Sequence, residues 1–341
     1  PRCHVAANYK SGIGFIDVLS QYVKSKNLPV EILLEVKATE LTTEGGKVTG
    51  VKGEGADGAQ YTFTAGSGVI LATGGFGANV EMRQKYNSIW ATLDESVPTT
   101  NSPAIVGDGI VMAEAIGANL VGMDKIQLLP MADPATRETS TIVGNSTGLV
   151  INKNGVRYVN EYERRDVLSA AALQQPDGIV YLISDQANSR IDENNLNTYG
   201  LNVDDLVASG NTYRADTLED LAAQMGVDPA TFAETVEKYN AAAKAGIDEE
   251  FGRVTFADNA AIDEGPFYAC PRSPAVHHTM GGVEVDKELH VLSADGSVIE
   301  GLYAAGEVTG GFHGGNRLGG NAISECLTTG RTAGANAAAK K

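Results

Sequence analysis

The sequence predicts an α/β domain that is interrupted by an inserted α+β domain. Short apolar runs end in glycines near both ends of the chain, at 69–77 and at 301–324. Glycines after a strand let the backbone approach a ligand closely. The region between them has another character, with loops, short strands and amphipathic helices. We therefore expect the first domain to comprise 1–123 and 279–341, with residues 124–278 inserted into it.

The first part of the chain alternates between helical and extended patterns. Helices show apolar residues three and four apart, whereas strands show alternating or continuous apolar runs. On this basis we predict a helix at 13–24, a buried strand at 30–36, hairpin strands at 47–55 and 60–66, a strand that stops at a ligand at 69–75, and a helix at 107–118.

The inserted region begins near residue 124, and its stretch 131–148 is rich in Thr, Pro and Gly and reads as a loop. A hairpin follows at 148–161, because Asn-Gly at 154–155 is a strong turn signal. We then predict a helix at 164–175, a strand at 179–185, and two amphipathic helices within 200–244 around a Gly-Val-Asp-Pro break.

Composition excludes several classes of function. The 341 residues are 43% hydrophobic, enough for two cores, and 43 acidic against 26 basic residues give a net charge of −17. Such a surface repels nucleic acid and anionic membranes, so a carboxylate ligand needs a local pocket of Arg and His. No signal peptide or membrane-spanning run is evident, which leaves the cytoplasm and the cell envelope open as locations.

The three cysteines, Cys3, Cys270 and Cys326, form no C-x-x-C pair. Zinc ribbons, dithiol redox centres and c-type haem attachment are therefore unsupported. The adjacent His277 and His278 lie on an extended segment and point to opposite faces. One can bind an anion, or both can be structural; zinc is disfavoured because no third ligand lies at a usual spacing.

The segment 301–324 reads as a strand, a glycine-rich loop and a helix start. The first turn of a helix has free N–H groups and a partial positive charge, which suit an anionic or electron-rich ligand edge. Arg317 lies among these glycines with little carboxylate near it in sequence. We interpret the segment as a ligand site rather than a structural loop.

Four segments together resemble a known family. The run Tyr303–Ser324 is similar to the C-terminal FAD signature of soluble fumarate reductases and their enoate-reducing relatives. SPAVHHTMGG at 273–282 resembles the substrate segment, NEYERRDVLSAAAL at 160–173 the helix that begins with the catalytic arginine, and DKIQLLP at 124–130 the entry into the capping domain. The chain thus resembles the fumarate reductase and succinate dehydrogenase flavoprotein family, with an FAD-binding α/β domain and an α+β capping domain.

The resemblance implies roles for individual residues. Glu307 binds the FAD ribose, and Asn321 through Ser324 offer N–H groups to the flavin pyrimidine edge. The full set of implied cofactor residues is Ala38, Thr73, Gly74, Gly75, Gly306, Glu307, Asn316, Gly319, Gly320, Asn321, Ala322, Ile323 and Ser324. The implied substrate residues are Leu129, Ser140, His278, Thr279 and Arg317, and the catalytic residues are Arg165, His278 and Arg317.

The implied substrate is a small unsaturated carboxylic acid, and the implied reaction passes hydride from flavin N5 to its β-carbon. His278 and Arg317 hold the carboxylate, and Arg165 protonates the α-carbon. Without the resemblance, Arg165 reads as a helix-surface salt bridge, because Glu161, Glu163 and Asp166 are near in sequence. No metal is implied.

The chain departs from the family in three ways. Leu129 stands where fumarate reductases place a carboxylate-binding histidine, so we expect one carboxylate and an apolar tail, as in acrylate-, cinnamate- or urocanate-type acids. Thr141 and Gly144 stand at the positions of a Glu and an Arg of the proton relay, with Glu138 as a candidate substitute.

The third departure concerns the nucleotide fingerprint. No G-x-G-x-x-G unit opens the chain, so we expect it to lack an N-terminal βαβ segment and to bind FAD weakly or not at all alone. The expected partners are that missing segment or an upstream electron-donor module. A true fumarate reductase and a catalytically silent fragment are the alternatives.

Overall fold

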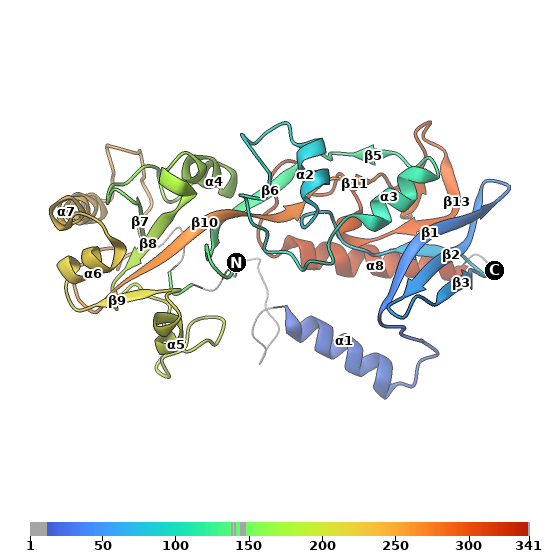
Figure 1. Ribbon diagram of the computed structural model, residues 1–341, viewed down its shortest axis with the longest axis horizontal. Coiled ribbons are helices and arrows are strands. Elements are labelled where there is room, and N and C mark those ends of the chain that lie inside the picture. Colours follow the sequence, from blue (N-terminus) through green and yellow to red (C-terminus); the bar gives the residue numbers. More distant parts are fainter. Residues whose placement is uncertain (1–11, 138, 140, 144–147, 340–341) are drawn as a thin grey trace. The chain divides into compact units, whose positions relative to one another are not determined.

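The computed structural model describes residues 12–137, 139, 141–143 and 148–339 (Figure 1). They divide into two compact units: unit 1 holds the described residues of 1–127 and 276–341, and unit 2 those of 128–275. The chain passes between the units within two strands, β6 (Ile126–Ala132) and β10 (Phe267–Thr279).

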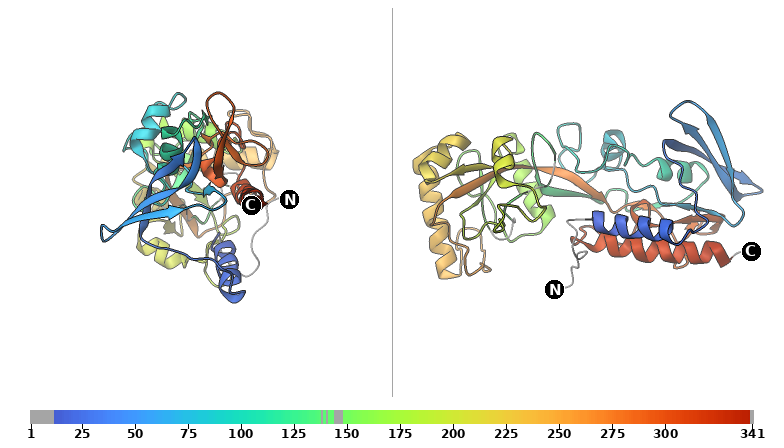
Figure 2. Two further views of the ribbon diagram at one scale, coloured as in Figure 1. Left: turned by 90° about the vertical axis from the view of Figure 1, so that its right-hand side faces the viewer. Right: turned by 90° about the horizontal axis from the view of Figure 1, so that it is seen from below.

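Unit 1 contains three small sheets and four α-helices among its described residues. Its elements are α1 (Ile13–Ser25), β1 (Val36–Glu44), β2 (Lys47–Gly55), β3 (Gln60–Thr64), β4 (Val69–Leu71), α2 (Val80–Tyr86), α3 (Asp108–Ala115), β5 (Leu120–Val121), β11 (Gly282–Val283), β12 (His290–Leu292), β13 (Val298–Ala304), the 3-10 turn η2 (Gly306–Val308) and α8 (Asn321–Ala339). The sheets are β1-β2-β3, β12-β13-β4 and β11-β5. Helix α8 packs along β13 and β4. In Figure 2 this helix is the red ribbon that leads to the C-terminus.

The structure confirms the predicted helices α1 and α3 and the hairpin β2–β3. The buried strand predicted at 30–36 is wrong. Residues 31–35, all described, form no strand, and Ile32, Leu33 and Leu34 are exposed. A buried strand needs a neighbouring strand that pairs its backbone groups, and none of the described strands pairs with residues 31–35. The strand begins instead at Val36 and pairs with β2.

The spacing G-x-G-x-x-G does occur within unit 1, at 53–58, but its setting is not that of a nucleotide site. The glycines lie at the end of β2 and in the turn that leads to β3. The Gly55 N–H donates to the Ala59 carbonyl at 2.8 Å, which closes the turn. The nucleotide fingerprint requires a helix after the strand, so this segment is a hairpin turn.

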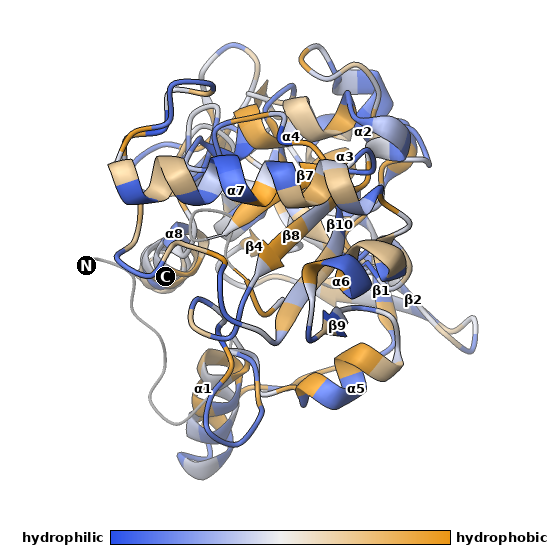
Figure 3. Ribbon diagram, turned by 90° about the vertical axis from the view of Figure 1, so that its left-hand side faces the viewer, coloured by the Kyte–Doolittle hydropathy of each residue, from blue (hydrophilic) through white to orange (hydrophobic). Residues whose placement is uncertain are grey.

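The described residues of unit 2 form a five-stranded sheet with helices on both faces. Its other elements are β7 (Leu149–Asn152), α4 (Arg165–Leu173), the 3-10 turn η1 (Pro176–Gly178), β8 (Val180–Ser184), α5 (Val203–Ala208), β9 (Tyr213–Ala215), α6 (Leu218–Met225) and α7 (Pro229–Ala245). The strand order is β6-β10-β8-β7, with β9 also paired to β10. Figure 3 shows the hydrophobic strand β8 beside this helical cover.

Alternation along β7 and β8 explains the two cores of unit 2, because successive strand side chains point to opposite faces. Leu149, Ile151 and Ile183 pack with α6 and α7, whereas Val150 and Leu182 pack with α4 and α5. The Gly-Val-Asp-Pro break between α6 and α7 is confirmed. Gly226 ends α6 with φ of +70°, and the Asp228 side chain caps α7.

The hairpin predicted at 148–161 forms only in part. The turn is present, because the Asn152 N–H donates to the Val156 carbonyl at 3.0 Å. Residues 156–161, all described, form no strand, and β7 pairs with β8 instead. The apolar β7 is buried between two layers of helices, and a partner that is itself continuously apolar satisfies it better than the polar segment after the turn. Within the described ranges, no helix has the length and apolarity needed to cross a bilayer.

Candidate functional site

Two parallel strands of unit 1 end at the same edge of their sheet. Leu302, Tyr303 and Ala304 of β13 pair with 69–71 of β4, and the Ala305 N–H donates to the Leu71 carbonyl at 2.9 Å. Gly74 after β4 and Gly306 after β13 both have φ near +75°, a conformation that favours glycine. The carboxyl ends of parallel strands are the usual ligand side of an α/β sheet.

Glu307 is the charged group at this edge. Its Oε1 accepts hydrogen bonds from the Thr279 N–H at 2.9 Å and the Thr279 hydroxyl at 3.1 Å. Its Oε2 lies 3.3 Å from His278 Nδ1. Burial by itself raises the pKa of the Glu307 carboxyl, but the hydrogen bonds from His278 and Thr279 outweigh it and hold the pKa below its ordinary value.

The adjacent histidines have separate partners, as the alternation along a strand predicts. His277 is half-buried, and its Nδ1 lies 2.8 Å from the Thr100 hydroxyl. His278 is buried and faces Glu307. The structure therefore gives the two imidazoles different chemical surroundings.

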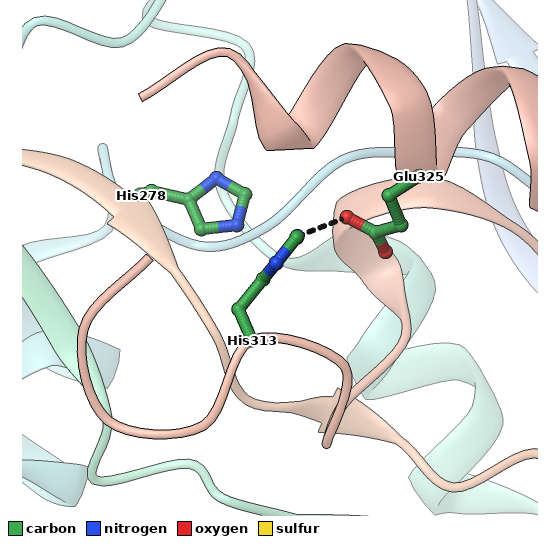
Figure 4. A group of neighbouring side chains, drawn as sticks. All are labelled: His278, His313 and Glu325. Carbon is green, nitrogen blue, oxygen red and sulfur yellow. Dashed lines mark hydrogen bonds and ion pairs between the residues drawn. The ribbon is translucent and has the colours of Figure 1, made fainter. Parts of the chain in front are cut away.

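His278 belongs to a cluster that the sequence analysis did not find. Its ring meets the His313 ring edge to face, with centroids 5.4 Å apart. His313 Nε2 lies 2.7 Å from Glu325 Oε2 (Figure 4). The three residues come from β10, the glycine-rich loop and α8, so no short spacing joins them. Two features of the sequence could have indicated this cluster. His313 lies within the glycine-rich run, and Glu325 lies one turn into the predicted helix.

Gln127 positions the loop that carries Arg317. Its Nε2 donates to Asn316 Oδ1 at 2.8 Å and to the Arg317 carbonyl at 2.7 Å. Both Gln127 and Arg317 are buried. Although Gln127 lies in one of the segments that carry the resemblance, its role was not predicted, because it depends on a contact across 190 residues of sequence.

The start of α8 fits an electron-rich ligand edge. Helix α8 begins at Asn321, and the N–H groups in the first turn of a helix have no acceptor within that helix. The buried Thr73 hydroxyl, just after β4, is unpartnered within the described ranges. At Gly75 an added Cβ would collide with Thr279 and Glu307, so the backbone there must stay bare. Free donors beside a bare backbone are the features that a flavin-binding edge requires.

The other predicted cofactor residues divide into two places. Gly319, Gly320, Asn321 and Ile323 lie with Ala322 and Ser324 at the loop-to-helix junction. Ala38 lies in β1, in a different sheet, where it pairs with Gly53. The structure therefore does not join Ala38 to this edge through any strand pairing of the described residues.

Arg165, at the start of α4 in unit 2, forms no salt bridge with any residue that the structure describes. Of its acidic sequence neighbours, Glu161 binds Arg157 and Arg253, and Asp166 binds Arg164. In the described part of the chain, the Arg165 side chain makes no hydrogen bond or ion pair, and its Nη1 is buried. Burial lowers the pKa of the Arg165 guanidinium below its ordinary value.

The remaining predicted positions are also in unit 2. Leu129 is buried in β6. Thr141 is buried, and its hydroxyl bonds the Val143 backbone, so it offers no charged relay. Ser140, Glu138 and Gly144 lie outside the described residues.

Glycines and a helix start at the ends of parallel strands are typical of nucleotide- or flavin-binding proteins. A family model described as "FAD binding domain" matches residues 2–323. The chain belongs to this family and, within it, to the fumarate reductase-like flavoproteins. The predicted resemblance is confirmed, and the comparisons support FAD as the cofactor.

Three curated relatives show where the chain falls in this family. It is 44% identical to an NADH:acrylate oxidoreductase of Vibrio harveyi, 40% to a urocanate reductase of Eggerthella lenta and 38% to a fumarate reductase (cytochrome) of Shewanella frigidimarina. Each alignment covers 96% of this chain but 32%, 54% and 55% of the relative. The chain thus spans about a third to just over half of their length.

Solved structures confirm the predicted fold class. A flavocytochrome c3 fumarate reductase in an open conformation matches 99% of this chain with a TM-score of 0.79 at 34% identity, over 57% of its own length. A 3-ketosteroid delta1-dehydrogenase from Sterolibacterium denitrificans matches 95% of this chain, and 62% of its own, with a TM-score of 0.73 at 26% identity. The fold is an α/β FAD-binding fold with a capping domain.

Proposed function

We propose that this chain is the FAD-binding, substrate-reducing part of an enzyme that reduces the double bond of an α,β-unsaturated carboxylic acid. The observation that carries the proposal is Arg165, a half-buried cation with no anionic partner among the described residues. A desolvated charge without a partner is costly in a purely structural role and is common at functional sites. The relatives are named as reductases of acrylate, urocanate and fumarate, which agrees with the proposed reaction.

In this proposal, bound and reduced FAD supplies a hydride to the β-carbon of the acid. Arg165 donates the proton that the α-carbon gains, so the double bond becomes a single bond and the guanidinium is later recharged by a relay. Its lowered pKa favours this donation. His278 and Arg317 bind the carboxylate and thereby polarise the alkene. We assign the ribose to Glu307 and the flavin edge to the free N–H groups at the start of α8.

We further propose that the substrate has a single carboxylate. Leu129 is buried and apolar, so it cannot bind a second carboxylate and suits an apolar, aromatic or heteroaromatic tail. A true fumarate reductase remains the alternative, as does a catalytically silent fragment. The proposed partner is an electron-donor module or a further segment that completes the flavin domain.

The FAD-loaded enzyme is expected to prefer monocarboxylic enoates over fumarate by more than tenfold in kcat/KM, because leaving a charge unpaired in a buried site costs several kcal/mol. The assay compares acrylate, cinnamate, urocanate and fumarate with reduced viologen as donor. A matched variant, Leu129→His, should shift the preference toward fumarate. Faster reduction of fumarate than of every monocarboxylic acid by the unaltered enzyme would overturn the assignment of Leu129.

Flavin binding gives a second test. The G-x-G-x-x-G spacing lies in a hairpin turn, so we expect the 341-residue chain alone to lose much of its FAD during gel filtration. Residual binding, measured by flavin absorbance, should fall further in Gly75→Ala, whose new Cβ reaches Thr279 and Glu307. Gly66→Ala is the control, since its Cβ would meet nothing within 4 Å. Stoichiometric FAD in the isolated chain contradicts the expectation of weak binding.

A further inference from the structure

We propose that His278, His313 and Glu325 form a binding site for a divalent transition-metal ion of the Zn²⁺ class. Each residue offers one ligand atom, and these atoms all lie within 4.8 Å of one another. The side chains are 4%, 11% and 5% exposed, so the ligand atoms are shielded from bulk water. Figure 4 shows the two rings and the carboxylate turned toward one another.

The ligand types select the metal. Two imidazoles and one carboxylate are a ligand set that zinc uses with a fourth position left open, whereas Ca²⁺ and Mg²⁺ prefer oxygen ligands alone. Bond lengths of about 2.0–2.1 Å place tetrahedral ligand atoms roughly 3.3 Å apart. The 2.7 Å His313–Glu325 hydrogen bond must therefore open when the metal binds, while the wider separations, all within 4.8 Å, close.

Neighbouring groups already orient the ligands. Glu307 Oε2 lies 3.3 Å from His278 Nδ1, so Nδ1 acts as the donor and Nε2 is left with its lone pair for a metal. The Thr309 hydroxyl lies 3.2 Å from Glu325 Oε1, the oxygen that His313 does not use, and shares its proton between that oxygen and the Gly306 carbonyl at 2.7 Å. In metal centres, a ligating histidine commonly donates its other ring N–H to a carboxylate. A ligating carboxylate commonly accepts a hydrogen bond on the oxygen that does not bind the metal.

Charge also favours a cation here. Glu325 in the cluster and Glu307 beside it supply two negative charges, which match a divalent ion. The chain as a whole carries a net charge of −17, which attracts cations over long range. No third ligand lies near His277 and His278 in the sequence, but folding brings Glu325 of α8 to His278 and His313.

A metal ion at this site takes the His278 imidazole away from the substrate carboxylate. We therefore expect Zn²⁺ to inhibit turnover and a chelator to restore it. This consequence rests on the proposed function, whereas metal binding itself does not. Metal binding without inhibition would contradict the role proposed for His278 and leave the metal site intact.

The direct test titrates the purified full chain with Co²⁺, whose visible absorption reports tetrahedral coordination, and then displaces it with Zn²⁺. We expect one equivalent to bind, and His313→Gln and Glu325→Gln to weaken binding by at least about tenfold. His290→Gln is the matched control, because His290 also pairs with a single carboxylate, that of Asp286, at 2.9 Å. It should bind as the unaltered chain does.

Thermal melts with and without Zn²⁺ check that the variants are folded and give a second readout. The unaltered chain should gain thermal stability from Zn²⁺, and the two ligand variants should not. Should one ligand variant fail to fold, the other and His278→Gln carry the same comparison. Equal Co²⁺ spectra and affinities in the ligand variants and the control would overturn the site and indicate adventitious surface binding.

Discussion

Arg165→Lys is expected to lower kcat by at least about a hundredfold while FAD and substrate binding are retained. A proton donor must reach one carbon at hydrogen-bond distance, and misplacing a catalytic group by about 1 Å can cost this much. Lysine keeps the positive charge, but its ammonium lacks the planar fork and the reach of a guanidinium. The loss should therefore appear in kcat rather than in KM.

The environment of Arg165 makes the result diagnostic. An exposed ion pair would change by less than about 1 kcal/mol on Arg-to-Lys replacement. Arg165 makes no such pair among the described residues, and burial lowers its pKa. A purely electrostatic or packing role predicts near-normal turnover in the lysine variant, so the two accounts differ by a measurable factor.

The adjacent Arg164 provides the matched control. It lies one residue earlier, its side chain is 71% exposed, and it pairs with Asp166 at 3.0 Å. Arg164→Lys should leave kcat and KM unchanged. Steady-state kinetics with reduced viologen, in the presence of a chelator, gives kcat and KM. Flavin spectral titration gives the affinities for FAD and for the substrate. Equal kcat in Arg165→Lys and Arg164→Lys would remove Arg165 from the mechanism.

His278→Ala and Arg317→Ala should behave differently from Arg165→Lys. Both side chains are proposed to hold the carboxylate before and during the reaction, so their loss weakens ground-state and transition-state binding together. We therefore expect KM to rise and kcat to fall in these two variants. A change in kcat alone would assign them a role other than carboxylate binding.

The sequence predicted those parts of the fold and site that are encoded locally. The strand-glycine segments at 69–75 and 301–324, the helix that starts at Arg165, and the Gly226–Pro229 break are all set by residues within a few positions of one another. Turn, helix-cap and strand signals depend on residues within a few positions of one another. They can therefore be recognised from the sequence without a structure. The order of the four family segments supplied the rest of the fold class.

Features that depend on distant residues were not predictable in this way. The link from Gln127 to Arg317 and the cluster of His278, His313 and Glu325 arise only when separate segments meet. The run at 30–36 shows the converse case. Its composition favours a strand, but strand formation also needs a pairing partner, which a local pattern cannot show.

Glu161→Gln is expected to destabilise unit 2 by about 3–5 kcal/mol, the usual loss when one partner of a buried ion pair is removed. Glu161 is fully buried and accepts hydrogen bonds from two arginines, Arg157 at 2.8 and 2.9 Å and Arg253 at 3.0 Å. Removing its charge leaves both guanidinium groups in the interior, with Asp248 at 2.7 Å from Arg157 as the carboxylate that remains.

Aromatic rings make this loss hard to relieve. The Arg253 guanidinium lies over the rings of Tyr239 and Phe256, 5.7 and 4.4 Å from their centroids, and Arg157 lies over Tyr239 and Phe251. The two guanidinium groups are therefore held between aromatic rings. They cannot become exposed to solvent without leaving a cavity in the core. Burial also raises the pKa of Tyr239 to about 12, so this phenol supplies no compensating negative charge near neutral pH.

Urea unfolding of the chain, followed by far-UV circular dichroism and fluorescence, measures the effect through the midpoint and the slope. Glu234→Gln is the matched control, because Glu234 pairs with Lys238 on the exposed face of α7, where screening by water makes the pair weak. Its midpoint should not move. A Glu161→Gln midpoint equal to that of the control would show that the buried arginines find other partners, and the ion-pair account of this core would then be wrong.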